Sequence, residues 1–149
     1  VHPSLMEFEL TETMLAESME EAAAVIRGLR ALGCKVSIDD FGTGYSSLNL
    51  LKDLNVDIIK LDKSFLNNME KQEKHRKNDV IVIKNIVNMV NDLDMEVIAE
   101  GVETQKQAEF LRGINFCMAQ GFLFDRPLPL DEYEKRLSCD HVYHISETE

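Results

Sequence analysis

Acidic side chains at the expected ends of strands carry the main chemical signal of this sequence. Glu9 lies near the end of a predicted first strand, Asp39 and Asp40 end the second, and Glu100 follows the fourth. Carboxylates gathered at one edge repel one another unless a cation offsets their charge, and such hard oxygen ligands favour Mg²⁺, Mn²⁺ or Ca²⁺ over zinc. Two divalent ions held roughly 3.5–4 Å apart are the usual arrangement for hydrolysing a phosphodiester. The pattern therefore suggests metal-assisted hydrolysis of a phosphate ester.

Lys60 would add a cationic group to the same place. It stands two residues before Asp62, so the two side chains share one face of an extended segment. A lysine among metal-bound acids is suited to orienting or deprotonating a water molecule, or to stabilising the charge of a phosphate. Taken alone, a lysine in this position is more often a surface residue whose ammonium reaches solvent.

The neighbouring Asp39 and Asp40 need a special backbone conformation to act together. In a regular strand their side chains would point to opposite faces. A turn that begins at Asp40, made possible by Gly42 and Gly44, would let both carboxylates reach one pocket. Taken alone, an Asp-Asp pair at a strand end is more often a turn or a helix cap.

An alternation of strands and helices positions these groups. Hydrophobic periodicity predicts strands over residues 5–10, 34–38, 56–61, 96–99 and 116–119, and helices over residues 14–32, 48–54, 80–90, 105–112 and 131–137. A glycine-rich loop covers residues 41–47, and the charged stretch 70–79 is either a solvated loop or an extension of a helix end. Thr104 and Gln107 form a predicted capping box. This order is typical of a parallel α/β protein.

Parallel α/β proteins gather functional groups at the carboxyl ends of their strands. The acids and the lysine named above would meet at that edge, together with Glu103 after the fourth strand and Gln120 after the fifth. This convergence, rather than any single residue, is the main argument for a functional site.

Composition narrows the class of protein. The chain has 149 residues, a net charge of −11 and 44% hydrophobic residues, which is consistent with one globular domain or part of one. The acidic balance argues against a nucleic-acid polymer as partner, because phosphate contacts need clustered lysine and arginine. There is no apolar run of the ~20 residues that a membrane helix needs, and the start does not resemble a signal peptide. Three widely spaced cysteines suggest no disulfide framework. We expect a cytoplasmic protein.

Taken together, five motifs resemble the C-terminal part of an EAL domain, the bacterial phosphodiesterase specific for cyclic di-GMP. They appear in order as EFELTE at 7–12, IDDFGTGYSSL at 38–48, IKLDKSF at 59–65, VIAEGVET at 97–104 and QGFLFDRP at 120–127. The resemblance covers about residues 5–137. It implies a modified (β/α)8 TIM barrel that hydrolyses cyclic di-GMP to linear pGpG with two Mg²⁺ or Mn²⁺ ions.

The resemblance also assigns roles to the residues that match the family's motifs. Glu9, Asp39, Asp40 and Glu100 match metal ligands. Lys60 matches the lysine near the attacking water, and Glu100 is expected to act in catalysis as well as at the second metal.

Further residues match the surroundings of the metals in the family. Glu12 resembles the glutamate that anchors the loop after the paired aspartates. Asp62, Glu103 and Gln120 are expected to bind substrate or to anchor loops. The loop at 41–47 resembles the one that shapes the metal site and contributes to dimer contacts.

The family's name motif, Glu-Ala-Leu, does not occur in this sequence. The family's metal-binding asparagine and its phosphate-binding arginine, which also belong to the first three strands, have no match either. A complete barrel takes about 250 residues. We therefore expect residues 1–149 to be a single truncated EAL domain, with about strands 4 to 8 of the barrel and little or no activity alone, from an active parent protein. Unpaired sheet edges would favour self-association or a rearranged sheet.

Two other functions remain open. The chain could belong to a non-catalytic regulatory module that binds cyclic di-GMP or a protein partner, although such members usually lose the acidic positions that are present here. An unrelated metal-dependent barrel enzyme, such as an enolase-type lyase, would also gather acids and a lysine at strand ends. Sensor or diguanylate-cyclase domains are common companions in this family.

Overall fold

A computed structural model describes residues 1–42, 51, 54–67, 73–114, 116 and 118–138. The predicted helix over 48–54, except residues 51 and 54, lies outside the described residues, as does the glycine-rich loop beyond Gly42. Among the described residues, no helix is both long enough and apolar enough to span a bilayer.

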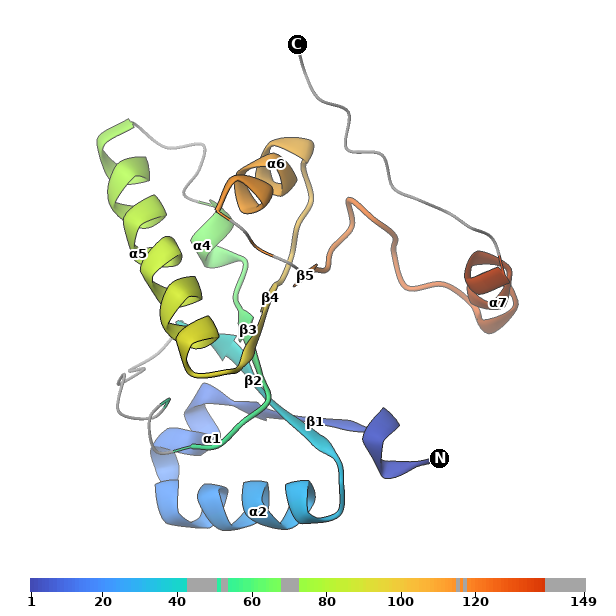
Figure 1. Cartoon of the computed structure of the whole chain (residues 1–149). Coiled ribbons are helices and arrows are strands. Elements are labelled where there is room, and N and C mark those ends of the chain that lie inside the picture. The colour runs from blue at the N-terminus through green and yellow to red at the C-terminus, as the bar shows by residue number, and fades with distance from the viewer. Residues whose placement is uncertain (43–50, 52–53, 68–72, 115, 117, 139–149) are drawn as a thin grey trace.

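Five parallel strands form one sheet in sequence order (Figure 1). They are β1 (Glu7–Thr11), β2 (Lys35–Phe41), β3 (Ile58–Leu61), β4 (Glu96–Ala99) and β5 (Met118–Ala119). The connections carry α1 (Glu12–Glu17), α2 (Met19–Ala31), α4 (Ser64–Asn67), α5 (Glu73–Asp92) and α6 (Gln105–Gly113), with a 3-10 turn η1 (Pro3–Leu5) before the sheet and α7 (Leu130–Ser138) after it. The predicted parallel α/β order is confirmed, and all five carboxyl ends meet at one edge.

The two faces of the sheet differ in chemistry. Alternate strand residues point into an apolar core with the helices, as shown by the buried Val36, Ile38, Ile59 and Val97. Three buried residues of α5, at the predicted helical spacing, belong to the same core: Ile83, Val87 and Val90. Many of the intervening strand positions carry charged side chains, namely Glu7, Glu9, Lys35, Asp39, Lys60 and Glu96. The face away from the helices is therefore the one that can support polar chemistry.

The predicted single helix over 14–32 is wrong, because Ser18 divides it into α1 and α2. Ser18 has an extended backbone, with φ −154° and ψ 92°, so α1 ends there. Its carbonyl then accepts a hydrogen bond from the amide of Ala22, which starts α2. Thr11 caps α1 through its hydroxyl, which accepts from the amide of Met14. The apolar pattern continues across the break, so periodicity alone could not reveal it.

Several other element boundaries also differ from the expectation. β2 extends through Phe41, so Asp39 and Asp40 lie within the strand rather than after it. The charged stretch belongs to α5 from Glu73 onward, which favours the helix extension over the loop. The capping box of Thr104 and Gln107 is confirmed.

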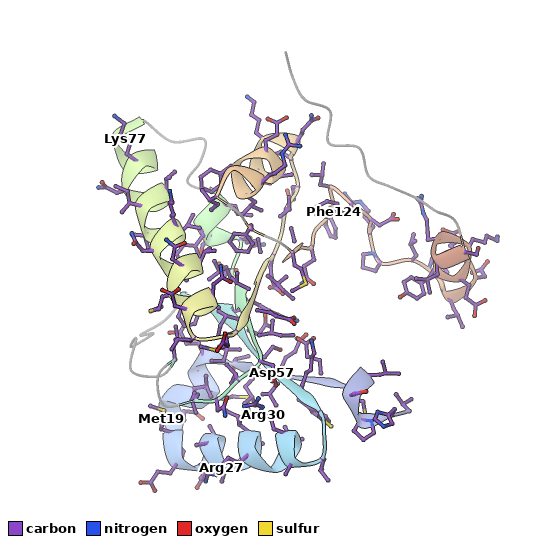
Figure 2. All side chains as sticks on the ribbon, viewed as in Figure 1. Met19, Arg27, Arg30, Asp57, Lys77 and Phe124 are labelled. Atoms are coloured by element: carbon purple, nitrogen blue, oxygen red, sulfur yellow. The ribbon has the colours of Figure 1, made fainter. Side chains whose placement is uncertain are left out.

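An ion pair fixes α2 against the amino-terminal side of the sheet. The guanidinium of Arg30 lies 3.1 Å from Asp57 Oδ1, and Figure 2 labels both residues. The other oxygen of Asp57 accepts from the amide of Val36, and Arg30 also donates to the carbonyl of Asn55. These contacts lie at the end of the sheet opposite to the acidic edge. The side chains of the acidic edge are therefore not needed to hold α2 in place.

Candidate functional site

A bulge at the end of β2 brings the paired aspartates together. The β2–β3 register shifts between Ile38 and Phe41, and Asp40 adopts a left-handed conformation with φ +53°. Carboxylate oxygens of Asp39, Asp40 and Glu100 consequently lie within 4.8 Å of one another. A bulge within the strand therefore takes the place of the hypothesised turn at Asp40, and Gly44, the second glycine of that hypothesis, lies outside the described residues.

Lys60 lies among three carboxylates at this edge. Its side chain is 8% exposed, and its ammonium pairs with Glu9, with Glu7 Oε1 at 3.7 Å and with Glu100 Oε1 at 3.9 Å. Burial lowers the pKa of Lys60, but the hydrogen bond to Glu9 and the charges of these three acids outweigh burial and raise the pKa above its ordinary value. Lys60 is therefore an ammonium that keeps its proton and donates hydrogen bonds, which favours charge stabilisation over deprotonation of water.

Glu100 carries an unusually high proton affinity. Burial, the charge of Asp39 and the weaker effects of Asp40 and Glu9 raise the pKa of Glu100 to about 7, against the attraction of Lys60. Gln120 Nε2 lies 2.6 Å from Glu100 Oε1 and fixes that oxygen by donating to it. Glu100 thus has one oriented oxygen within a group of acids that repel one another.

The three clustered acids fit a divalent cation. The pKa of Asp40 is also raised, first by burial and then by the charges of Asp39 and Asp62, with Lys63 opposing. Asp39 Oδ1 is buried and has no hydrogen-bond partner within the described part of the chain. A buried acceptor without a donor is costly unless another group satisfies it, and hard oxygen ligands suit Mg²⁺, Mn²⁺ or Ca²⁺.

Glu9 is the predicted metal ligand that the structure places elsewhere. It pairs with Lys60 and lies outside the cluster of Asp39, Asp40 and Glu100. Its side chain is half exposed. The structure therefore brings three of the four predicted ligands together.

Glu12 secures the start of the loop after the aspartates. Its side chain is buried, and Oε2 accepts from the amide of Gly42 at 3.0 Å. Gly42 has φ +97°, and a Cβ there would lie 2.2 Å from Phe65 Cε2. The position therefore requires glycine, and the contact fits the loop-anchoring role expected for Glu12.

A cleft of about 770 Å³ opens beside the carboxylates. Asp62, Glu103 and Gln120 line it with Asp40 and Glu100, as the sequence predicted for this edge. Asp62 also lies just before α4, and its Oδ1 accepts from the amide of Ser64, the first residue of that helix, at 2.9 Å.

Part of the cleft lining was missed by sequence reasoning. It carries cationic and aromatic side chains: Lys63, Phe122, Arg126, Tyr133 and Arg136. The guanidinium of Arg126 stacks 4.3 Å from the Phe122 ring centroid, and Arg136 pairs with Asp125 at 3.2 Å. The signal that was available is that Lys63 and Arg126 lie within two of the quoted motifs, at 59–65 and 120–127, in a chain of net charge −11.

The raised pKa of Glu100 predicts that the metal-free chain loses stability as pH rises. The folded chain keeps a proton on Glu100 up to about pH 7, whereas an unfolded glutamate loses it near 4.5. Between these values the folded state binds more protons, so the free energy of unfolding falls with pH. We expect a loss of about 2 kcal/mol from roughly pH 5 to pH 8, after allowance for solvent screening.

Urea unfolding at a series of pH values measures this loss. Glu100→Gln should flatten the pH dependence in that window. A stability that increases from pH 5 to pH 8 in the unsubstituted chain would contradict the assignment.

A parallel sheet with clustered carboxylates at its carboxyl edge, beside a cleft, defines a barrel-type α/β domain suited to a divalent cation. The chain belongs to the EAL domain family, whose sequence model matches residues 1–127.

Curated relatives cover most of this chain. It is 41% identical to "Cyclic di-GMP phosphodiesterase NbdA" of Pseudomonas aeruginosa, over 89% of this chain and 16% of that protein. It is 40% identical to "Signaling protein YkoW" of Bacillus subtilis, over 89% and 16%. It is 37% identical to "Bifunctional diguanylate cyclase/cyclic di-GMP phosphodiesterase MucR" of P. aeruginosa, over 89% and 19%. The chain thus spans less than a fifth of the length of each of these relatives.

Solved structures agree on the fold. "PaMucR Phosphodiesterase, c-di-GMP complex" matches with a TM-score of 0.80 and 36% identity, over 89% of this chain and 52% of that one. The manganese and cyclic di-GMP complex of Klebsiella pneumoniae BlrP1 matches with a TM-score of 0.77 and 34% identity, over 85% and 31%. The five strands and their helices are therefore part of an EAL-type TIM barrel, as the sequence predicted.

Proposed function

We propose that this chain is part of a phosphodiesterase domain that hydrolyses cyclic di-GMP to linear pGpG. The observation that carries the proposal is the cluster of Asp39, Asp40 and Glu100, within 4.8 Å of one another, beside a cleft in a chain of the EAL family. The names of NbdA and MucR and the cyclic di-GMP complex of PaMucR support this substrate.

The proposed cofactor is a pair of Mg²⁺ or Mn²⁺ ions. Asp39, Asp40 and Glu100 would hold them, with Glu9 as a further ligand after release from Lys60. When bound, such ions activate water and offset the charge of a phosphodiester. The manganese complex of BlrP1 supports the choice of metal.

Other side chains of the site would bind and orient the nucleotide. The Lys60 ammonium, whose raised pKa keeps it protonated, donates toward negative charge that develops on the phosphate. Gln120 fixes one oxygen of Glu100, and Glu12 holds the backbone that follows the aspartates. Lys63 and Arg126 on the cleft wall supply positive charge for a dianionic nucleotide.

The proposal extends to the whole protein. Residues 1–149 would be one truncated EAL domain that hydrolyses little cyclic di-GMP alone, because the Glu-Ala-Leu motif does not occur in them. The longer protein would be active, with sensor or diguanylate-cyclase domains as companions. Self-association is also proposed, since in the described sheet β1 pairs with β2 and β5 with β4, so each has an edge open to another strand.

The test compares this chain with one extended upstream by roughly 100 residues, toward the length of a whole barrel. Both are incubated with cyclic di-GMP and Mn²⁺ or Mg²⁺, and pGpG is measured by chromatography. Formation of pGpG by the longer chain alone would support the proposal in full. Binding without cleavage by the longer chain would instead favour the regulatory module. Sedimentation velocity of the same samples reports self-association.

A further inference from the structure

The Lys60 ammonium has a third carboxylate beside it that belongs to none of the assigned roles. Glu7 Oε1 lies 3.7 Å from Lys60 Nζ, and the Glu7 side chain is 32% exposed. Glu7 and Glu9 are two apart on β1, so both lie on the sheet face away from the helices. Glu7 lies outside the cluster of Asp39, Asp40 and Glu100. Within the described part of the chain, the ion pair with Lys60 is therefore its link to the site.

The sheet allows Lys60 to reach both glutamates. β2 separates β1 from β3, a distance of roughly 9–10 Å for two strand spacings. The β2 residue in register with Glu9 is Ser37, which is fully buried. A small side chain at this position leaves room for the long lysine to cross β2.

Cation binding would take away two of the three partners of Lys60. Glu9 and Glu100 are both proposed ligands, and a carboxylate that binds a divalent cation is a weaker partner for an ammonium. Lys60 is only 8% exposed, so water cannot replace them fully, and an unpaired buried charge is costly. Glu7 is the remaining carboxylate of the three.

We propose that Glu7 is a positioning residue that receives the Lys60 ammonium when Glu9 turns to the cation. This inference rests on the proposed function, because it requires a cation at the carboxylate cluster. Glu7 lowers the cost of releasing Glu9 and keeps the ammonium at the edge of the cleft. Without Glu7, Lys60 remains paired with Glu9 and competes with the cation for the Glu9 carboxylate.

The test is a double-mutant cycle on the affinity for Mn²⁺ of a longer protein that contains this chain within a complete EAL domain, measured from the electron paramagnetic resonance signal of free Mn²⁺. Glu7→Gln is expected to raise the Kd about tenfold, as is typical for the loss of a group that orients a metal ligand. In a Lys60→Met background, the same substitution should change the Kd by less than about twofold. Lys60→Gln replaces Lys60→Met if circular dichroism shows that the methionine variant does not fold.

Glu96→Gln is the matched control. Glu96 is also a strand glutamate paired with a lysine, Lys35, at 3.3 Å, but both side chains are about half exposed. We expect its Kd to stay within about twofold of the unsubstituted protein, since exposed ion pairs contribute little.

Three results would overturn the role of Glu7. The first is an unchanged Kd in Glu7→Gln. The second is an equal increase in Kd with and without Lys60, which would mean that Glu7 attracts the cation by its charge alone. The third is an equal increase in Kd in Glu96→Gln. If the unsubstituted longer protein bound no Mn²⁺, the metal site of the proposed function would itself fail, whereas Mn²⁺ binding with an unchanged Kd in Glu7→Gln would overturn the role of Glu7 alone.

Discussion

Asp40→Asn, in a protein that contains this chain within a complete EAL domain, is expected to lower the rate of cyclic di-GMP hydrolysis by roughly 10²–10³-fold. The substitution removes one of three carboxylates whose oxygens lie within 4.8 Å, and a neutral amide is a poor ligand for a hard cation. The backbone should not change, because Asp40 has φ +53° and asparagine tolerates this left-handed conformation as well as aspartate does. The measurement is pGpG formation under saturating Mn²⁺ or Mg²⁺.

Asp94→Asn provides a matched control for this experiment. Asp94 is exposed and has φ +57°, so the same chemical change is made in the same backbone conformation. It lies in the turn between α5 and β4, at the end of β4 opposite to Glu100. We expect its rate to stay within about twofold of the unsubstituted protein. A rate of Asp40→Asn above about a tenth of the unsubstituted rate would show that Asp40 is not needed for hydrolysis.

The order of strands and helices was predictable from hydrophobic periodicity. The meeting of acids at one edge was predictable because the carboxyl ends of parallel strands lie at the same edge of a sheet. Once periodicity placed Asp39 and Glu100 at the carboxyl ends of two strands of one parallel sheet, β2 and β4, their presence at the same edge followed from topology. Regular spacing could not indicate the break at Ser18, since the apolar pattern continues from α1 into α2.

The pairing of charges within the site was not predictable from spacing. Lys60 could have faced solvent, and only the register and the small Ser37 on β2 show that it reaches Glu7 and Glu9. The cationic wall of the cleft depends on the path of the chain after β5, which carries Arg126 and Phe122 back toward the acidic edge. Such long-range placement leaves no local periodic signal.

Gly121→Ala is expected to destabilise the chain by about 3 kcal/mol or more. Gly121 has φ +155°, and a Cβ at this position would lie 2.3 Å from both the backbone nitrogen and the oxygen of Val102. Those atoms are themselves fixed, because the amide of Val102 donates to the carbonyl of Gln120 and its carbonyl accepts from the amide of Leu123. A backbone contact of this kind cannot be relieved by rotating a side chain, so the segments after β4 and β5 must separate.

Gly28→Ala is the comparison that isolates this effect. Gly28 lies in α2, and a Cβ there would meet nothing within 4 Å. Alanine should therefore stabilise the helix by about 0.5–1 kcal/mol. The two variants make the same change with opposite expected signs, and urea unfolding measures both. Equal midpoints would contradict the close approach of Gly121 to Val102. A lower midpoint for Gly121→Ala alone would show that this approach, beside the residue that donates to Glu100, contributes to the stability of the folded chain.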